Sequence, residues 1–317
     1  MKNKTKKIAF ISSLVAVSLL VVHLINKFIF YINTYKEHLH SDHSHYYQWR
    51  FGKIFYTKEG SGPSLLLVHD LNHASSYYEW KEVVATLSKD FTVYSIDLLG
   101  CGRSEKPNMI YTNYLYVQLI SDFVRDVIGE ETSIVSSRFS TSISIMASYI
   151  DSKLFNRLIL INPVDIETLN KYPKRKHRIC RIFLNIPILG NLIYNIENSR
   201  YQLFKRFHND YIYGKKSMSR YINAYSEAAH TGGSSAKYVY TSLRSYYTNT
   251  NITHALKALS TPVLLIEGDS CNNAQKIVKE YEAINSSIES TWILNAKELP
   301  HIENPEQIAN IIRENLQ

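Results

Sequence analysis

A segment near the middle of the chain brings polar side chains to a point where a strand turns into a helix. A short apolar strand is expected over residues 133–137, and apolar residues at helical spacing follow through residue 150. This order of strand, sharp turn and helix is that of a nucleophile elbow, whose pattern G-x-S-x-G presents one hydroxyl group for covalent catalysis. Here the turn has an arginine at its centre, and its five positions are Ser136, Ser137, Arg138, Phe139 and Ser140.

The elements that must position this turn alternate between strands and helices. Such alternation predicts a mostly parallel sheet with helices on both faces. Strands are expected at residues 51–57, 64–69, 92–97, 133–137, 157–161, 262–267 and 291–294, and helices at 78–87, 114–128 and 304–316.

The alternation stops between Pro163 and Ala258, where the sequence predicts helices and loops without clear strands. An insertion after the strand at residues 157–161 would lie over the carboxyl edge of a parallel sheet, where ligands bind. We therefore expect a helical cap over residues 163–258.

Four segments, in the same order along the chain, resemble one family. Residues 97–107 follow the pattern D-x-x-G-x-G-x-S-x-x-P, and residues 65–70 end in a histidine turn that would supply a backbone amide to an oxyanion hole. Residues 262–268 resemble the strand before an acid loop, and residues 299–306 the final loop and helix start. Together they resemble the capped branch of the α/β-hydrolase fold, which includes haloalkane dehalogenases, epoxide hydrolases and esterases. The resemblance covers residues 50–317.

The catalytic positions implied by this resemblance carry unsuitable side chains. Counting back from the strand at residues 157–161 places Arg138 at the nucleophile, Cys271 stands at the acid, and Glu298 stands at the histidine. A triad needs a hydroxyl, a base that takes its proton and a carboxylate that orients the base. A guanidinium stays protonated in proteins and cannot act as a nucleophile. The resemblance therefore implies a member without the usual hydrolysis.

The oxyanion-hole equivalents are Asp70, Leu71 and Phe139, with Asp70 where the family has glycine. Ser137 and His301 are the fallback candidates for a displaced triad. For His301 the resemblance implies a packing role under the loop, with a hydrogen bond to backbone.

Two interpretations of Arg138 follow. Arg138 and Glu298 replace a nucleophile and its base, so they are expected to face each other as an ion pair, a contact that can be bidentate. Alternatively, Arg138 and neighbouring backbone N–H groups bind an anionic ligand such as a carboxylate or a lipid phosphate.

The N-terminus has the pattern of a membrane anchor. Lys2, Lys4, Lys6 and Lys7 precede an uncharged run of 19 residues, Ile8 to Asn26. That length is close to the ~20 residues that span a bilayer. A cleaved signal peptide is the alternative, but residues 23–30 offer no small-x-small cleavage site. We expect residues 1–30 to form a cytoplasmic tail and a single span in the cell membrane, with the main domain outside the cytoplasm.

Residues 31–49 are expected to form a juxtamembrane linker with four histidines. Histidine-rich tracts can bind metal, but no cysteine or ordered scaffold supports a site, so a solvated spacer is favoured. The three cysteines, Cys101, Cys180 and Cys271, give no disulfide framework. No metal or cofactor is expected.

The cap carries the basic charge of the chain. Residues 171–220 contain 12 lysines and arginines against two acids, whereas the whole chain has a net charge of +8. An apolar run at residues 182–194 lies within this range. A basic region beside an apolar one suits an anionic membrane surface, and an ordinary cap helix with solvated lysines is the alternative. No nucleic-acid-binding motif is present, so nucleic acid is not an expected partner.

We therefore expect a membrane-anchored α/β-hydrolase-fold protein, non-catalytic, that binds an apolar or anionic ligand or a partner at the membrane surface. The alternatives are an active hydrolase of ester or lipid-like substrates with a displaced triad, and a protein-interaction module formed by the cap.

Overall fold

The computed structural model describes residues 2–212 and 218–317 and is built on one central sheet. The strand order is β1-β2-β4-β3-β5-β6-β7-β8. β1, β2 and β4 pair antiparallel, and all later neighbours pair parallel. The strands are β1 (Ser44–Trp49), β2 (Gly52–Glu59), β3 (Ser64–Val68), β4 (Thr92–Ile96), β5 (Thr132–Ser137), β6 (Phe155–Ile161), β7 (Val263–Gly268) and β8 (Glu289–Ile293). The mostly parallel sheet predicted from the sequence is confirmed.

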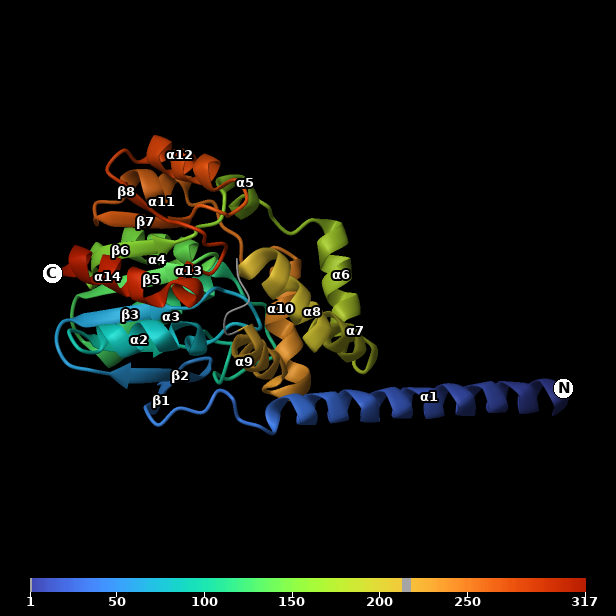
Figure 1. Cartoon of the computed structure of the whole chain (residues 1–317). Helices are drawn as coiled ribbons and strands as arrows, with labels where there is room; N and C mark the ends of the chain where they lie inside the picture. Colours follow the sequence, from blue (N-terminus) through green and yellow to red (C-terminus); the bar gives the residue numbers. More distant parts are fainter. Residues whose placement is uncertain (1, 213–217) are drawn as a thin grey trace.

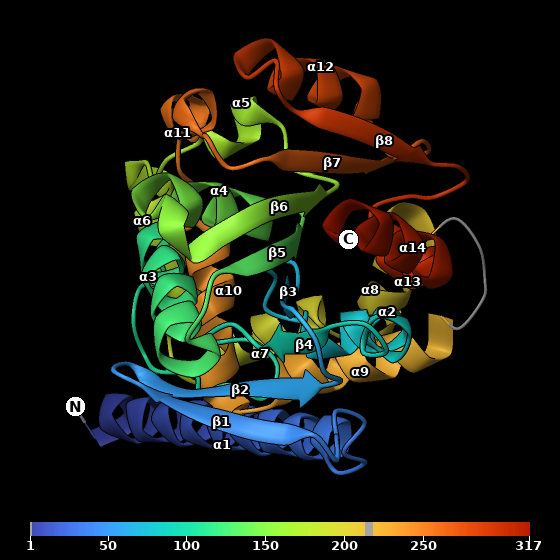
Figure 2. The same ribbon diagram turned by 90° about the vertical axis from the view of Figure 1, so that its left-hand side faces the viewer.

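Helices cover both faces of the sheet because the parallel strands are apolar on both sides. In β3, Leu65 and Leu67 pack toward α2 and α14, whereas Leu66 and Val68 pack into the core formed with α3 and α4. Figure 2 shows these two layers on opposite sides of the strands. The helices of the layers are α2 (Lys81–Leu87), α3 (Asn113–Phe123), α4 (Ser140–Ile150), α11 (Thr253–Ala258), α12 (Ala274–Ile284) and α14 (Pro305–Leu316), and α13 (Pro300–Glu303) precedes α14.

A set of helices inserted after β6 forms the cap beside the sheet (Figure 1). Aromatic and aliphatic side chains from cap and body share one buried cluster, which includes Tyr77, Phe207, Tyr225 and Ile302. The cap was expected to end at residue 258, but it ends before α11. That helix packs against α4 and α12 and so belongs to the body. The short α5 (Ile166–Leu169) also packs into the main core of the body through Leu169. The cap helices are α6 (Arg175–Asn185), α7 (Leu189–Glu197), α8 (Arg200–Arg206), α9 (Met218–His230) and α10 (Lys237–Arg244).

The range expected to be a juxtamembrane linker carries β1, the edge strand of the sheet. Tyr46 pairs with Phe55 of β2, and Trp49 is buried. The strand contains the adjacent Tyr46 and Tyr47 beside polar residues, so it lacks the strict alternation that predicts a half-buried strand. The body therefore begins at residue 44 instead of residue 50.

Helix α1 (Lys2–Thr34) projects away from the body (Figure 1). Its apolar side chains, including Phe10, Leu14 and Leu20, are exposed. Among the described residues, Lys4–Thr34 is a helix long and apolar enough to cross a membrane.

Candidate functional site

Arg138 stands at the tip of the turn between β5 and α4. Its φ of 51° lies in the left-handed region, which a residue other than glycine seldom adopts outside tight turns. The Arg138 N–H donates to the carbonyl of Ile161 at the end of β6, 2.9 Å away. The turn thus keeps the sharp geometry of a nucleophile elbow, with Arg138 at the position expected from the sequence.

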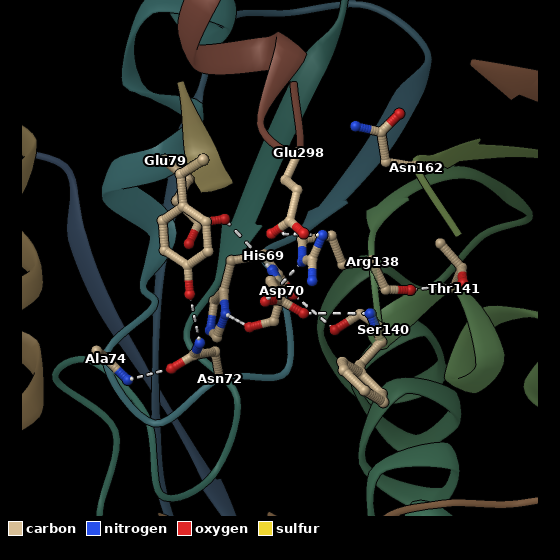
Figure 3. Close-up of polar contacts among 12 residues, drawn as sticks. His69, Asp70, Asn72, Ala74, Glu79, Arg138, Ser140, Thr141, Asn162 and Glu298 are labelled. Carbon is tan, nitrogen blue, oxygen red and sulfur yellow. Dashed lines mark hydrogen bonds and ion pairs between the residues drawn. The ribbon is translucent and has the colours of Figure 1, made fainter. Parts of the chain in front are cut away.

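The guanidinium of Arg138 forms an ion pair with Glu298, which lies in the loop before α13. The Nη1 to Oε2 distance is 2.9 Å, and both side chains are partly buried. The ion pair predicted from the sequence is therefore confirmed. It has a single close contact instead of a bidentate one, because the guanidinium also faces a second carboxylate (Figure 3).

That second carboxylate is Asp70, in the loop after β3. Its Oδ2 lies 3.4 Å from Arg138 Nε, an ionic contact that lacks the geometry of a hydrogen bond. Its Oδ1 accepts the backbone N–H of Phe139 over 3.1 Å. Phe139 is one of the oxyanion-hole equivalents, and this donor is therefore already engaged by a negative group of the protein itself.

Burial sets the electrostatics of this network. It raises the pKa of Asp70 to about 7, although Arg138 pulls that pKa down. It also raises the pKa of Glu298, again against Arg138. Burial alone would lower the pKa of Arg138, but the two carboxylates outweigh it and hold that pKa above its ordinary value. With two carboxylates around one guanidinium, an added anion would be repelled, which disfavours the anionic-ligand interpretation of Arg138.

Cys271, at the acid position, lies in the loop after β7. Burial, with Glu267 adding to it, raises the pKa of its thiol to about 12. The thiol accepts a hydrogen bond from Asn162 Nδ2 over 3.3 Å. A neutral thiol cannot orient and charge-stabilise a base as a carboxylate does.

Asn162 joins three loops at the site. It was not predicted from the sequence as a site residue. Its side chain accepts the N–H of Gly268 and donates to the carbonyl of Lys297, both over 2.7 Å. Its φ of 46° is unusual for a residue that follows a strand. The available signal was an Asn-Pro pair directly after an apolar strand, which favours a turn.

His301 lies under this site as part of a buried pair. Its Nε2 is 3.5 Å from Glu79 Oε2, and both side chains are fully buried. Its ring stacks on Trp80 with a centroid distance of 4.3 Å. Burial would raise the pKa of Glu79, but the contact with His301 outweighs it and lowers that pKa. The hydroxyl of Tyr225 in the cap also donates to Glu79.

This arrangement corrects the role implied for His301. Neither ring nitrogen has a hydrogen-bond partner in the described part of the chain, so its polar contact is the one to the Glu79 carboxylate and not a bond to backbone. Glu79 was not singled out from the sequence, because an acid near the start of a helix usually faces solvent.

The two serines that flank Arg138 and Phe139 in the turn have no base beside them. Ser137 is fully buried, and its hydroxyl has no hydrogen-bond partner in the described ranges. Ser140 donates to the carbonyl of His69 over 2.6 Å. Within residues 2–212 and 218–317, no hydrogen bond links a serine or cysteine side chain to a histidine ring. Leu71 packs into the main core.

Two further polar residues at strand ends have structural roles. The carboxylate of Asp97 accepts the N–H groups of Tyr77 and Arg103, both over 2.6 Å. At Gly102, with a φ of 46°, an added Cβ would lie 2.1 Å from Asp97 Oδ2. Asp165 accepts the N–H of Thr168 and caps α5. Asp97 thus joins its own loop to the segment at Tyr77, and Asp165 fixes the start of α5.

The histidine-rich stretch stays close to the edge strands. His45 stacks on Tyr56, and His43 lies 3.9 Å from Glu59. In the described part of the chain, no group of three or more His, Cys, Asp or Glu side chains is placed to hold a metal ion.

Comparison with known proteins identifies the family. The profile of the alpha/beta hydrolase family matches residues 65–311, and the chain belongs to this family. An uncharacterized protein of Mycobacterium tuberculosis is 34% identical over 103 residues, which cover 32% of this chain and 30% of that protein. A soluble epoxide hydrolase of Corynebacterium is 27% identical over 112 residues, or 35% of this chain and 38% of that enzyme. These matches span about a third of the relatives' length.

Solved structures share the fold over longer stretches. A serine hydrolase involved in carbazole degradation has a TM-score of 0.70 at 17% identity and covers 86% of this chain and 98% of its own. A membrane phospholipase A has a TM-score of 0.67 at 18% identity and covers 100% of this chain and 98% of its own. At these identities the likeness concerns the fold alone.

Proposed function

We propose that this chain is a membrane-anchored alpha/beta hydrolase relative that acts by binding and not by hydrolysis. The observation that carries the proposal is the Asp70 carboxylate on the N–H of Phe139, directly beside Arg138 at the elbow tip. A tetrahedral intermediate needs an attacking hydroxyl and free N–H donors for its oxyanion. Here the guanidinium of Arg138 stands where the attacking hydroxyl would be. The carboxylate of Asp70 already accepts the N–H of Phe139, which would be one of the oxyanion donors.

The ligand class that best fits is apolar, or a partner protein. The charged groups at the elbow are already paired with each other, so they add little attraction for a further anion. The cap instead carries an apolar groove on α8 and α9, whose lining includes Phe204, Met218 and Ile222. Such surfaces bind apolar molecules through buried area.

The anchor is α1, with its lysine-rich start in the cytoplasm and the body outside it. Support comes from the exposed apolar length of the helix and from the lysines at residues 2–7. The orientation can be measured with Leu294→Cys, an exposed position of the body, in a Cys180→Ser background. A membrane-impermeant maleimide should label it in intact cells, whereas labelling only after lysis would reverse the orientation.

The catalytic part of the proposal is tested on the full chain in detergent micelles. Wild type, Ser137→Ala, Ser140→Ala and Arg138→Ser are compared for p-nitrophenyl ester hydrolysis and for labelling by a fluorophosphonate. We expect no reaction above the heat-denatured protein in any of the four, because Arg138→Ser alone restores neither a base nor an acid. Wild-type activity that disappears in Ser137→Ala would establish the displaced-triad hydrolase instead.

A further inference from the structure

The cap carries an exposed apolar surface on two successive helices. α6 and α7 meet at a bend of 101°. Spacings of three and four residues place the apolar side chains of each helix on one face. Ile182 and Phe183 are 61% and 62% exposed. We call this surface the cap tip and define it as Ile182, Phe183, Ile186, Leu189, Ile193 and Ile196, all of which are exposed. Exposed apolar patches of this kind usually mark an interaction site.

Contacts with α1 fix the position of the cap tip along the anchor. Asn26, which is buried, donates from Nδ2 to the carbonyl of Ile188 over 2.9 Å. Its Oδ1 accepts a hydrogen bond of 2.9 Å from Asn195. The bend between α6 and α7 therefore lies at the level of Asn26.

That level is where the uncharged run of the anchor ends, directly before Lys27. From Ile8 to Asn26 a helix rises about 27 Å at 1.5 Å per residue, close to the ~30 Å thickness of the hydrocarbon core. α6 and α7 also lie on the side of the body toward which α1 projects (Figure 1). When α1 spans the membrane, the cap tip thus meets the boundary between hydrocarbon and headgroups.

The charges of α6 identify the kind of surface it meets. Arg175, Lys176 and Arg178 are exposed on it, and the helix has no acidic residue. The basic residues occupy the first turn of α6, and Ile182 and Phe183 of the cap tip its last turn. Basic and apolar side chains close together on one helix are typical of helices that lie in an anionic interface. With 11 and nine residues, α6 and α7 are each too short to span the bilayer. They therefore fit a position in the headgroup region.

We propose that the cap tip inserts into the leaflet from which α1 emerges and binds anionic phospholipid headgroups. This inference rests on the membrane anchoring proposed above. The body then has two attachments, the span and the cap tip, and the cap is held against the bilayer.

The test uses the full chain in vesicles that contain brominated lipids, which quench tryptophan at the depth of the bromine atoms. Phe183→Trp reports on the cap tip, and Leu14→Trp reports on the span. Ile150→Trp is the matched control, because Ile150 is 53% exposed and lies at the end of α4 that points away from the elbow. The wild type, with three tryptophans, gives the background.

We expect bromolipids to reduce the emission of Phe183→Trp and Leu14→Trp relative to the wild type, but not that of Ile150→Trp. The loss for Phe183→Trp should be larger with phosphatidylglycerol than with phosphatidylcholine alone. Emission of Phe183→Trp that matches the Ile150→Trp control, while Leu14→Trp is quenched, would overturn the cap contact and leave the anchor intact. An unquenched Leu14→Trp would overturn both.

A second measurement needs no substitution in α6. Cys180 is exposed on this helix, whereas Cys101 is buried and Cys271 partly buried. A polarity-sensitive dye on Cys180 should shift its emission to the blue when the protein passes from detergent micelles into anionic nanodiscs. Emission equal to that of the dye in water would contradict insertion.

Discussion

Asp70 in the loop after β3 and Phe139 at the start of α4 are joined by a hydrogen bond of 3.1 Å from the Phe139 N–H to the Asp70 carboxylate. The related enzymes implied by the sequence have glycine at the first of these positions, which leaves the N–H free for an oxyanion. The same carboxylate also faces Arg138, which in turn pairs with Glu298. The substituted positions of the elbow and the loops around it therefore interact with one another in one network.

The first prediction concerns the strength of the Arg138–Glu298 pair. Glu298→Gln and Arg138→Met should each lower the free energy of unfolding by about 1–3 kcal/mol, between the values for exposed and buried ion pairs. The double variant should lose less free energy of unfolding than the sum of the losses of the two single variants. Urea denaturation of the full chain in detergent measures the three values as a double-mutant cycle.

Glu289→Gln is the control, because it breaks the Arg157–Glu289 pair on the surface, where Glu289 is 67% exposed. Glu289→Gln should lower the free energy of unfolding by less than ~1 kcal/mol. Additive losses in the Arg138–Glu298 cycle would mean that the pair does not stabilise the fold.

The second prediction concerns the pH dependence of stability through Glu267 in β7. Burial raises the pKa of this carboxyl to about 8, and its Oε2 has no partner in the described part of the chain. Its folded-state pKa lies above the unfolded value of about 4.3. Its contribution to stability is therefore complete below that value and is lost as the pH rises through 8.

Glu267→Gln removes this titration with almost no change in shape. At pH 5 the variant and the wild type should unfold at similar urea concentrations, and at pH 9 the variant should be more stable by a few kcal/mol. Glu314→Gln, an exposed position, should show no such difference. Equal pH dependence in Glu267→Gln and the wild type would show that Glu267 is not buried as a neutral acid.

The apolar runs were sufficient to predict most of the sheet. Each parallel strand lies within two residues of its expected bounds. The inner strands β3, β5 and β7 are buried on both faces, and such strands are nearly continuous in hydrophobicity. β1 was not predicted, because an edge strand needs only one apolar face and therefore has no continuous apolar run. The Arg138–Glu298 pair followed from assigning both residues to positions that touch in the family.

Contacts that cross between loops were not predictable in the same way. The hydrogen bond from Phe139 to Asp70 depends on a rotamer that reaches a neighbouring loop. The Glu79–His301 pair depends on a residue in a short helical turn whose burial no local pattern indicates. These contacts join residues distant in the sequence, and only the packed fold brings them together.

The third prediction concerns His301 as the partner of the buried Glu79. His301→Phe keeps an aromatic ring against Trp80 but leaves the carboxylate of Glu79 without its ionic partner. A buried charge without a partner costs about 3–5 kcal/mol, so the variant should be strongly destabilised in urea denaturation. Adding Glu79→Gln to His301→Phe should recover much of the loss. Full stability of His301→Phe alone would contradict a charged pair.

The last prediction concerns whether substitutions can restore a reactive nucleophile at the elbow, and how far Asp70 suppresses that reactivity. Arg138→Ser, Cys271→Asp and Glu298→His together restore a hydroxyl, an acid and a base at the positions that the family uses. The triple variant still has the Asp70 carboxylate on the N–H of Phe139, whereas adding Asp70→Gly frees that donor. Loss of one oxyanion donor slows acyl transfer about 10²–10³-fold.

The quadruple variant should therefore react with a fluorophosphonate at position 138, and the triple variant should react roughly 10²–10³ times more slowly or not at all. Rates of labelling by the full chain in detergent, with the modified peptide identified by mass spectrometry, give both values. Equal rates would mean that Asp70 leaves the oxyanion site open and that the residues at positions 138, 271 and 298 account by themselves for the lack of reaction. A slower triple variant would establish that the carboxylate of Asp70 occupies the place of the oxyanion.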